Sequence, residues 1–102
     1  MSGESYSLYI LQCADDSLYT GIARDVQNRI GEHQSGSKGA KYLRGRTPFK
    51  LVFEQLVGTR SAAQSLEHRI KKLSKAKKLA LIAGRLSIDH LNFRHTSGSS
   101  LG

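Results

Sequence analysis

The sequence predicts a small α/β (α+β) domain in which helices flank a mainly antiparallel three-stranded sheet. Apolar and polar residues alternate over residues 6–13 and 18–23, a third apolar run covers 49–57, and later apolar residues recur at helical spacing. These patterns are typical of strands and amphipathic helices. A chain of 102 residues supports a single hydrophobic core. We therefore expect one domain over residues 1–93 and a flexible tail over residues 94–102.

The first two predicted strands form a hairpin around a polar turn. Residues 14–17 read Ala-Asp-Asp-Ser, and such side chains hydrogen-bond to the backbone in turns. The expected register places Tyr9 opposite Gly21 and beside Tyr19. A glycine inside a strand often marks a place where a ligand or another backbone comes close. The hairpin therefore presents two tyrosines on one face beside a residue without a side chain.

The first predicted helix begins after Asp25, which is a favourable N-cap residue, and ends where the sequence reads Gln-Ser-Gly. Val26 and Ile30 are expected to form its apolar stripe. Arg29 and His33 are four positions apart, so they share another face of this helix.

A long break separates this helix from the third strand. Residues 35–48 are rich in glycine and serine and are predicted as a loop, and loops of this length inside compact domains are usually functional or disordered. In the strand over residues 49–57, we expect Phe49, Leu51 and Phe53 to face one helix layer together.

The second predicted helix begins at a capping box formed by Ser61 and Gln64. Its apolar stripe consists of Ala63, Leu66, Ile70 and Leu73. Glu67 lies at the edge of that stripe. A third, short helix is predicted after Ser74, with Leu79 and Ile82 facing inward and Gly84 ending it.

The formal charge of +8 and the pI near 10.0 favour an anionic partner, most often nucleic acid. Two windows without acidic residues, 38–50 and 69–78, hold most of the 16 lysines and arginines. The predicted nucleic-acid-binding residues are Arg24, Lys38, Lys41, Arg44, Arg46, Lys71 and Lys72. The alternatives are a basic protein that is merely soluble and a helix face that is merely solvated.

Composition also excludes several classes of site and location. The single cysteine, Cys13, excludes an internal disulfide and a cysteine-rich zinc site, and its place in an apolar strand indicates a small core residue. No apolar run approaches the roughly 20 residues that span a bilayer. The first residues lack a signal-peptide pattern, so we expect a cytoplasmic protein without membrane contact.

Five residues taken together resemble the GIY-YIG endonuclease family. The first family element stands here as Ser7-Leu8-Tyr9, which keeps only the tyrosine, and the second as Tyr19-Thr20-Gly21, which keeps the first and last residues. Arg29, His33 and a later helical Glu67 match the family order over roughly residues 5–83. The chain is most similar to the small stand-alone bacterial members.

This resemblance implies hydrolysis of phosphodiester bonds with one divalent ion, Mg²⁺ or Mn²⁺. Glu67 would hold the metal, and a lone carboxylate suits an ion that keeps most of its waters. Arg29 would contact the phosphate oxygens. Tyr9 takes the position of the general base, while Tyr19 and His33 would position the water or relay the proton. His33 is an alternative base.

Each of these residues also has an ordinary structural interpretation. The tyrosines suit a partly buried sheet, and His33 suits a helix surface. Arg29 has Glu32 or Asp25 within reach as an ion-pair partner, and Glu67 has Lys71 at a spacing of four.

Three functions follow from these alternatives. The first is a metal-dependent endonuclease acting on DNA, with RNA as a possible substrate and little sequence specificity, because basic side chains suit phosphate contacts more than base readout. The second is a non-catalytic nucleic-acid-binding module, and the third is a protein-interaction domain. We expect a monomer or a weak dimer.

Overall fold

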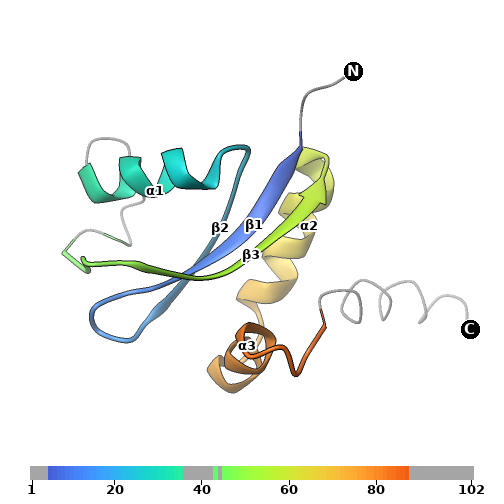
Figure 1. Ribbon diagram of the computed structural model, residues 1–102. Coiled ribbons are helices and arrows are strands. Elements are labelled where there is room, and N and C mark those ends of the chain that lie inside the picture. The colour runs from blue at the N-terminus through green and yellow to red at the C-terminus, as the bar shows by residue number, and fades with distance from the viewer. Residues whose placement is uncertain (1–4, 36–42, 44, 88–102) are drawn as a thin grey trace, which may run out of the picture.

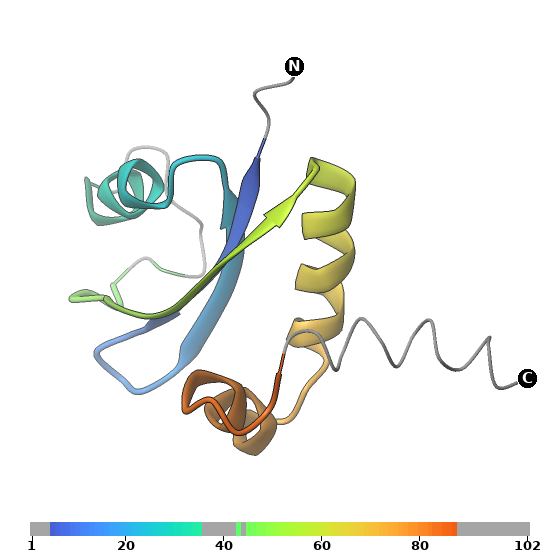
Figure 2. The same cartoon turned by 45° about the vertical axis from the view of Figure 1, so that its right-hand side comes forward.

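The computed structural model describes residues 5–35, 43 and 45–87. Its antiparallel sheet has the strand order β2-β1-β3, in which β1 is Tyr6–Gln12, β2 is Leu18–Ala23 and β3 is Lys50–Gly58. The described helices are α1 (Val26–Ser35), α2 (Arg60–Lys71) and α3 (Lys75–Ile82). Helix α1 covers one face of the sheet and α2 the other (Figure 1, Figure 2). The predicted fold class is confirmed. The predicted tail over residues 94–102 lies outside the described residues.

Strand β1 supplies two separate cores because its side chains alternate between the faces of the sheet. The α2-side core consists of Leu8, Ile10, Leu66, Ile70 and Leu81. The α1-side core consists of Tyr9, Leu11, Cys13, Ala23, Val26 and Leu43. The expected burial of Cys13 is therefore confirmed. Both faces of the middle strand are dry, and the tyrosine of the first family element lies in the α1-side core.

The predicted single face of β3 is wrong. The register between β1 and β3 shifts between Ile10 and Leu11, so that Ile10 pairs with Phe53 and Leu11 with Leu51. Such an irregularity inserts an extra residue and reverses the alternation. Phe53 accordingly packs against the α2-side core, whereas Phe49 and Leu51 pack against the α1-side core.

The helix caps agree with the sequence at two of three positions. The Asn28 amide donates to Asp25 Oδ1 at 3.0 Å and the Lys77 amide to Ser74 Oγ at 3.2 Å. The predicted Ser61 cap of α2 is wrong. Thr59, two residues before Ser61, caps this helix instead, and its hydroxyl accepts a hydrogen bond from the Ala62 amide at 3.1 Å. The backbone of Thr59 is extended, as is usual for an N-cap residue.

Helix α3 turns a different leucine inward from the one predicted. Leu79, expected to face inward, is 42% exposed, whereas Leu81 is 2% exposed in the α2-side core. Ile82 packs there as expected, and Gly84 ends the helix with φ +83°. Within the described ranges, no helix has the length and apolar character needed to cross a bilayer.

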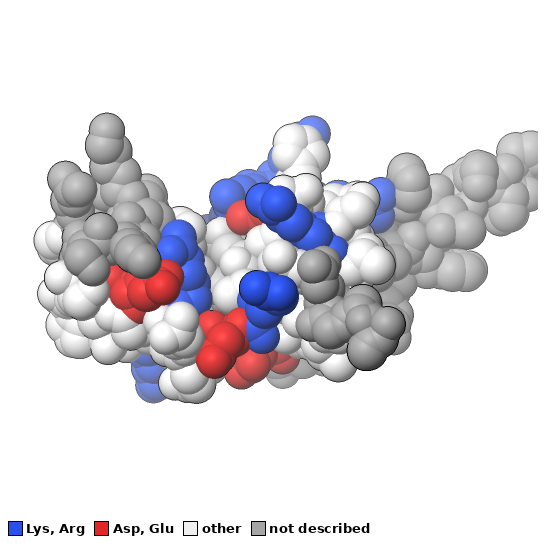
Figure 3. Space-filling view, turned by 90° about the horizontal axis from the view of Figure 1, so that it is seen from above, with Lys and Arg blue, Asp and Glu red and all other residues white. Residues whose placement is uncertain are grey.

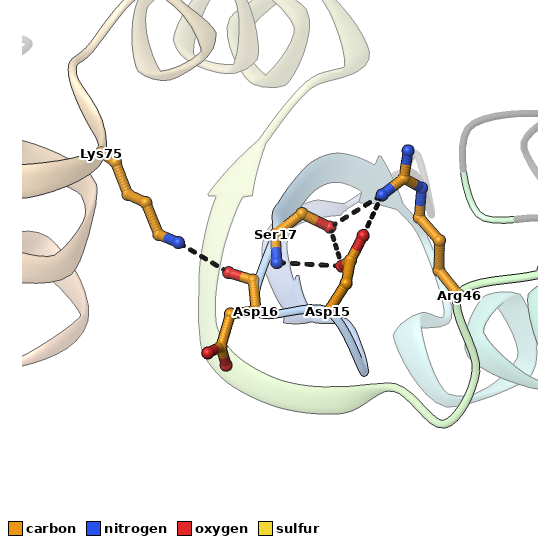
Figure 4. Close-up of polar contacts among 5 residues, drawn as sticks. All are labelled: Asp15, Asp16, Ser17, Arg46 and Lys75. Atoms are coloured by element: carbon orange, nitrogen blue, oxygen red, sulfur yellow. Dashed lines mark hydrogen bonds and ion pairs between the residues drawn. The ribbon is translucent and has the colours of Figure 1, made fainter.

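The turn between β1 and β2 is held from two sides (Figure 4). The Ser17 hydroxyl and amide donate to Asp15 Oδ1 at 2.6 and 3.1 Å, and these bonds, with the Arg46 charge, lower the pKa of the Asp15 carboxyl. Arg46 forms an ion pair with Asp15. On the other side, Lys75 Nζ of α3 donates to the Asp16 carbonyl at 2.8 Å. The turn therefore fixes both α3 and the segment before β3.

Candidate active site

A buried hydrogen bond joins the middle strand to the first helix. Tyr9 Oη lies 2.9 Å from His33 Nε2, and the two residues are 1% and 4% exposed. Strand alternation directs Tyr9 towards α1, and His33 reaches it from the last turn of that helix. Interpreting His33 as a surface helix residue is therefore wrong. A tyrosine and a histidine joined in a dry interior are suited to passing a proton.

Gly21 makes room for this bond. It pairs with Tyr9 across the hairpin, as the sequence predicted. A Cβ atom at position 21 would lie 2.6 Å from Tyr9 Oη, 2.7 Å from Tyr9 Cζ and 3.1 Å from Tyr19 Cε2. Any side chain here would push the phenol away from His33. The glycine is required by close approach, not by backbone conformation.

Tyr19 forms the more open side of the cluster. Its ring meets the His33 ring edge-on at 5.5 Å between centroids and lies 6.3 Å from the Tyr9 ring. Lys71 Nζ of α2 lies 6.0 Å from the centre of the Tyr19 ring. Tyr19 therefore connects the α1 side of the site to α2, which packs on the opposite face of the sheet.

Arg29 points at the same cluster from α1. Its guanidinium donates to Glu32 Oε1 at 2.8 Å, so the ion pair considered from the sequence is present. Burial raises the pKa of Tyr9, and the same guanidinium offsets part of that rise through its charge and a hydrogen bond. Glu32 thus holds a partly exposed cation beside the Tyr9 hydroxyl.

Burial decides the charge states of Tyr9 and His33. Desolvation, followed by the nearby Tyr19, raises the pKa of Tyr9 well above its ordinary value, and Arg29 offsets only part of this. Desolvation, followed by the Arg29 charge, lowers the pKa of His33, against a smaller opposing effect of Glu32. Both groups are therefore uncharged at neutral pH.

Glu67 lies on α2, with its side chain 21% exposed and Oε2 3.1 Å from Lys71 Nζ. Burial is the main cause that raises the pKa of Tyr9 and of Tyr19, and the negative charge of Glu67 adds a smaller contribution to both, so Glu67 belongs to the same electrostatic cluster. The described residues contain no group of three or more His, Cys, Asp or Glu that could enclose a metal. A single carboxylate fits an ion such as Mg²⁺ that retains most of its water.

The structure thus brings together Tyr9, Tyr19, Arg29, His33 and Glu67 from β1, β2, α1 and α2.

Of the predicted basic residues, Lys71 lies beside this cluster, Lys72 is exposed at the end of α2, and exposed Arg24 shares a shallow cavity with Arg29. Arg46 is engaged at the hairpin turn. Lys38, Lys41 and Arg44 lie outside the described residues. On the side of the molecule seen from above in Figure 3, basic side chains of the described residues lie beside acidic ones, so that side is not uniformly positive.

Two residues beside the cluster escaped prediction. Thr20 and Lys78 line a cavity together with Tyr19 and Lys71. For Thr20, strand alternation predicts only that its side chain lies on the opposite face of the sheet from Tyr19. Lys78 cannot be told apart from the other lysines of α3 in the sequence. No local signal connects these two residues, because only the packing of α3 near β2 brings them together.

Comparisons with known proteins agree with this arrangement. Residues 5–80 match the family model described as the GIY-YIG catalytic domain. A UPF0213 protein of Natronomonas pharaonis is 49% identical over 83 residues, covering 81% of this chain and 95% of the relative. A UPF0213 protein of Vibrio cholerae is 49% identical over 85 residues, covering 82% and 83%.

Two solution NMR structures are also similar. That of a UPF0213 protein from Bacillus halodurans is 46% identical, with a TM-score of 0.51, covering 78% of this chain and 83% of that one. That of an E. faecalis protein is 32% identical, with a TM-score of 0.54, covering 91% and 88%. The chain therefore belongs to the GIY-YIG family.

Proposed function

We propose that this protein is a divalent-metal-dependent endonuclease that hydrolyses phosphodiester bonds in DNA with low intrinsic sequence specificity. Membership of the GIY-YIG family supports a nuclease. The observation that carries the proposal is the buried 2.9 Å contact between Tyr9 Oη and His33 Nε2. A purely structural hairpin has no need of a tyrosine over a glycine and bonded to a neutral histidine.

The proposed proton path uses Tyr9 and His33 as a pair. Because the pKa of Tyr9 is raised, a free phenolate is not available at neutral pH. The phenol oxygen instead accepts a proton from the attacking water while its own proton passes to His33 Nε2. The lowered pKa of His33 keeps its ring neutral, and in the tautomer that carries its proton on Nδ1 the Nε2 atom accepts the Tyr9 proton. The choice between Tyr9 and His33 as base is thereby replaced by a relay.

The remaining residues stabilise and position the substrate. Arg29, held by Glu32, places a fixed positive charge beside the Tyr9 hydroxyl, where phosphate oxygens would gather negative charge. Tyr19 borders the attacking water. Glu67 would hold one Mg²⁺ or Mn²⁺ ion, which supplies charge stabilisation for the leaving oxygen when bound.

A non-catalytic nucleic-acid-binding module is the competing function. The ion pair between Glu67 and Lys71 favours it, because the carboxylate is already neutralised without a metal. This alternative predicts DNA binding that weakens steeply with salt and does not lead to cleavage.

Nicking of supercoiled plasmid DNA with Mg²⁺ or Mn²⁺ tests the proposal. We expect Tyr9→Phe to lower the rate about 10²- to 10⁴-fold, the range for loss of a positioned proton-transfer group. Tyr6→Phe removes a hydroxyl from the same strand and should nick at the parental rate. Glu67→Ala should abolish the metal-dependent rate. Parental activity in both Tyr9→Phe and Glu67→Ala would contradict the proposed site. A parent protein that binds DNA but does not cleave it would favour the binding module.

A further inference from the structure

A cavity of about 320 Å³ lies next to the candidate active site. Its walls come from three elements: β2, the end of α2 and the middle of α3. The lining residues are Leu18, Tyr19, Thr20, Lys71 and Lys78. Tyr19 belongs to the candidate catalytic cluster and Lys71 lies beside it, so the cavity continues that cluster around the edge of the sheet.

The charge of this cavity is positive. Its lining residues include two lysines and no acidic residue. Lys71 is partly neutralised by Glu67 at 3.1 Å. The side chain of partly buried Lys78 has no ion-pair partner within the described part of the chain. No carboxylate of the described residues therefore neutralises Lys78, and an anion in the cavity would pair with it.

Thr20 adds a neutral polar group to the same wall. It is 3% exposed, and its hydroxyl has no hydrogen-bond partner among the described residues. A buried hydroxyl without a partner is uncommon and calls for an explanation. Its oxygen has less than 1 Å² of accessible area, so a bound oxyanion would accept a hydrogen bond from it only once the neighbouring side chains move aside.

We propose that this cavity binds a phosphate group of the nucleic-acid strand that flanks the phosphate to be cleaved. Lys71 and Lys78 neutralise it, and Thr20 donates a hydrogen bond. The inference rests on the proposed function, because it places the strand across Tyr19 from the candidate catalytic residues. Its role is to fix the register of the strand, since phosphate contacts position the backbone and base contacts specify sequence.

The test is DNA affinity without metal, measured by fluorescence anisotropy with a labelled duplex in EDTA over a range of salt concentrations. Loss of one phosphate contact should reduce the slope of log affinity against log salt by about 0.9. We expect this for Lys78→Met. Lys77→Met is the matched control, because Lys77 is exposed, lies one position earlier on α3 and does not line the cavity. Equal slopes for the two variants would overturn the subsite.

Thr20→Val tests the hydroxyl while keeping the side-chain shape. If the hydroxyl serves the phosphate, affinity should fall severalfold while the melting temperature holds or rises, because a buried unpaired group is removed. Parental affinity would overturn the role of Thr20. Displacement of DNA by inorganic phosphate at ionic strengths where chloride does not displace it would reassign the cavity to a free phosphate compound.

These measurements are independent of catalysis. If the parent protein nicks DNA but Lys78→Met and Lys77→Met bind DNA equally, only the phosphate subsite is contradicted. If the two variants bind DNA differently but the parent protein does not nick DNA, only the proposed nuclease activity is contradicted.

Discussion

The two faces of the sheet are made from the same strand but differ in kind. On the α2 side, Leu8 and Ile10 meet mainly aliphatic residues such as Leu66, together with Phe53. On the α1 side, Tyr9 lies between them in sequence and meets His33 through a hydrogen bond. Aliphatic packing depends on volume and area, whereas the polar pair depends on distance and direction. The α2-side face is stabilised by apolar packing, whereas the α1-side face combines apolar packing with a buried polar pair held in fixed geometry.

Truncating the aliphatic face should have the largest effect on stability. Leu66→Ala removes a side chain that is 1% exposed and should lower the free energy of unfolding by about 2–5 kcal/mol in urea denaturation. Leu79→Ala, on a leucine that is 42% exposed, should change it by less than about 0.5 kcal/mol. Similar costs for the two leucines would contradict the placement of α3.

Adding one methyl group to the polar face should have the next largest effect. Gly21→Ala would place a Cβ atom 2.6 Å from Tyr9 Oη, and the buried ring has no free space into which to move. We expect about 1–3 kcal/mol of destabilisation, with a nicking rate at least as low as that of Tyr9→Phe.

Gly31→Ala is the matched control for this change. Apart from its chain neighbours and the backbone of its own helix, no atom lies within 4 Å of its added Cβ, and its site is an exposed helix position. Alanine should stabilise α1 there by roughly 0.5–1 kcal/mol. Parental stability and activity in Gly21→Ala would show that Tyr9 does not lie against position 21.

The pH dependence of stability should show the smallest effect. His33 has a lowered pKa in the folded protein, so the unfolded chain binds protons more readily below about pH 6.5. Unfolding free energy should therefore fall as the pH drops from about 6.5 through the folded pKa of His33. Urea denaturation should show a weaker fall for His33→Gln than for His68→Gln, which alters an exposed histidine. Identical profiles for the two variants would contradict the burial of His33.

The sequence was sufficient where local rules act alone. The hairpin register followed from alternation and turn chemistry, and it correctly placed Tyr9 opposite Gly21. It was insufficient where neighbouring elements decide. The register shift beside Leu11 divides the β3 side chains between two cores, and the packing of α3 turns Leu81 inward in place of Leu79. The register shift and the orientation of α3 both depend on contacts between distant segments, and the periodicity of the sequence carries no information about such contacts.

The candidate site divides in the same way. The order of its five residues along the chain was visible, and the structure brings all five into one cluster. The assignment of catalytic roles remains a prediction. The Tyr9–His33 contact was not foreseeable, because it spans strand and helix and depends on the depth at which α1 packs. Thr20 and Lys78 were invisible for the same reason.

The hairpin tip has a consequence for engineering this protein. Exposed tips of hairpins are ordinarily chosen for inserting tags or reporter domains. Here the tip at residues 14–17 anchors Arg46 on one side and Lys75 on the other. An inserted peptide would detach the segment leading into β3 and the start of α3 in a single change. A fusion partner therefore belongs elsewhere on the chain, although this tip looks accessible.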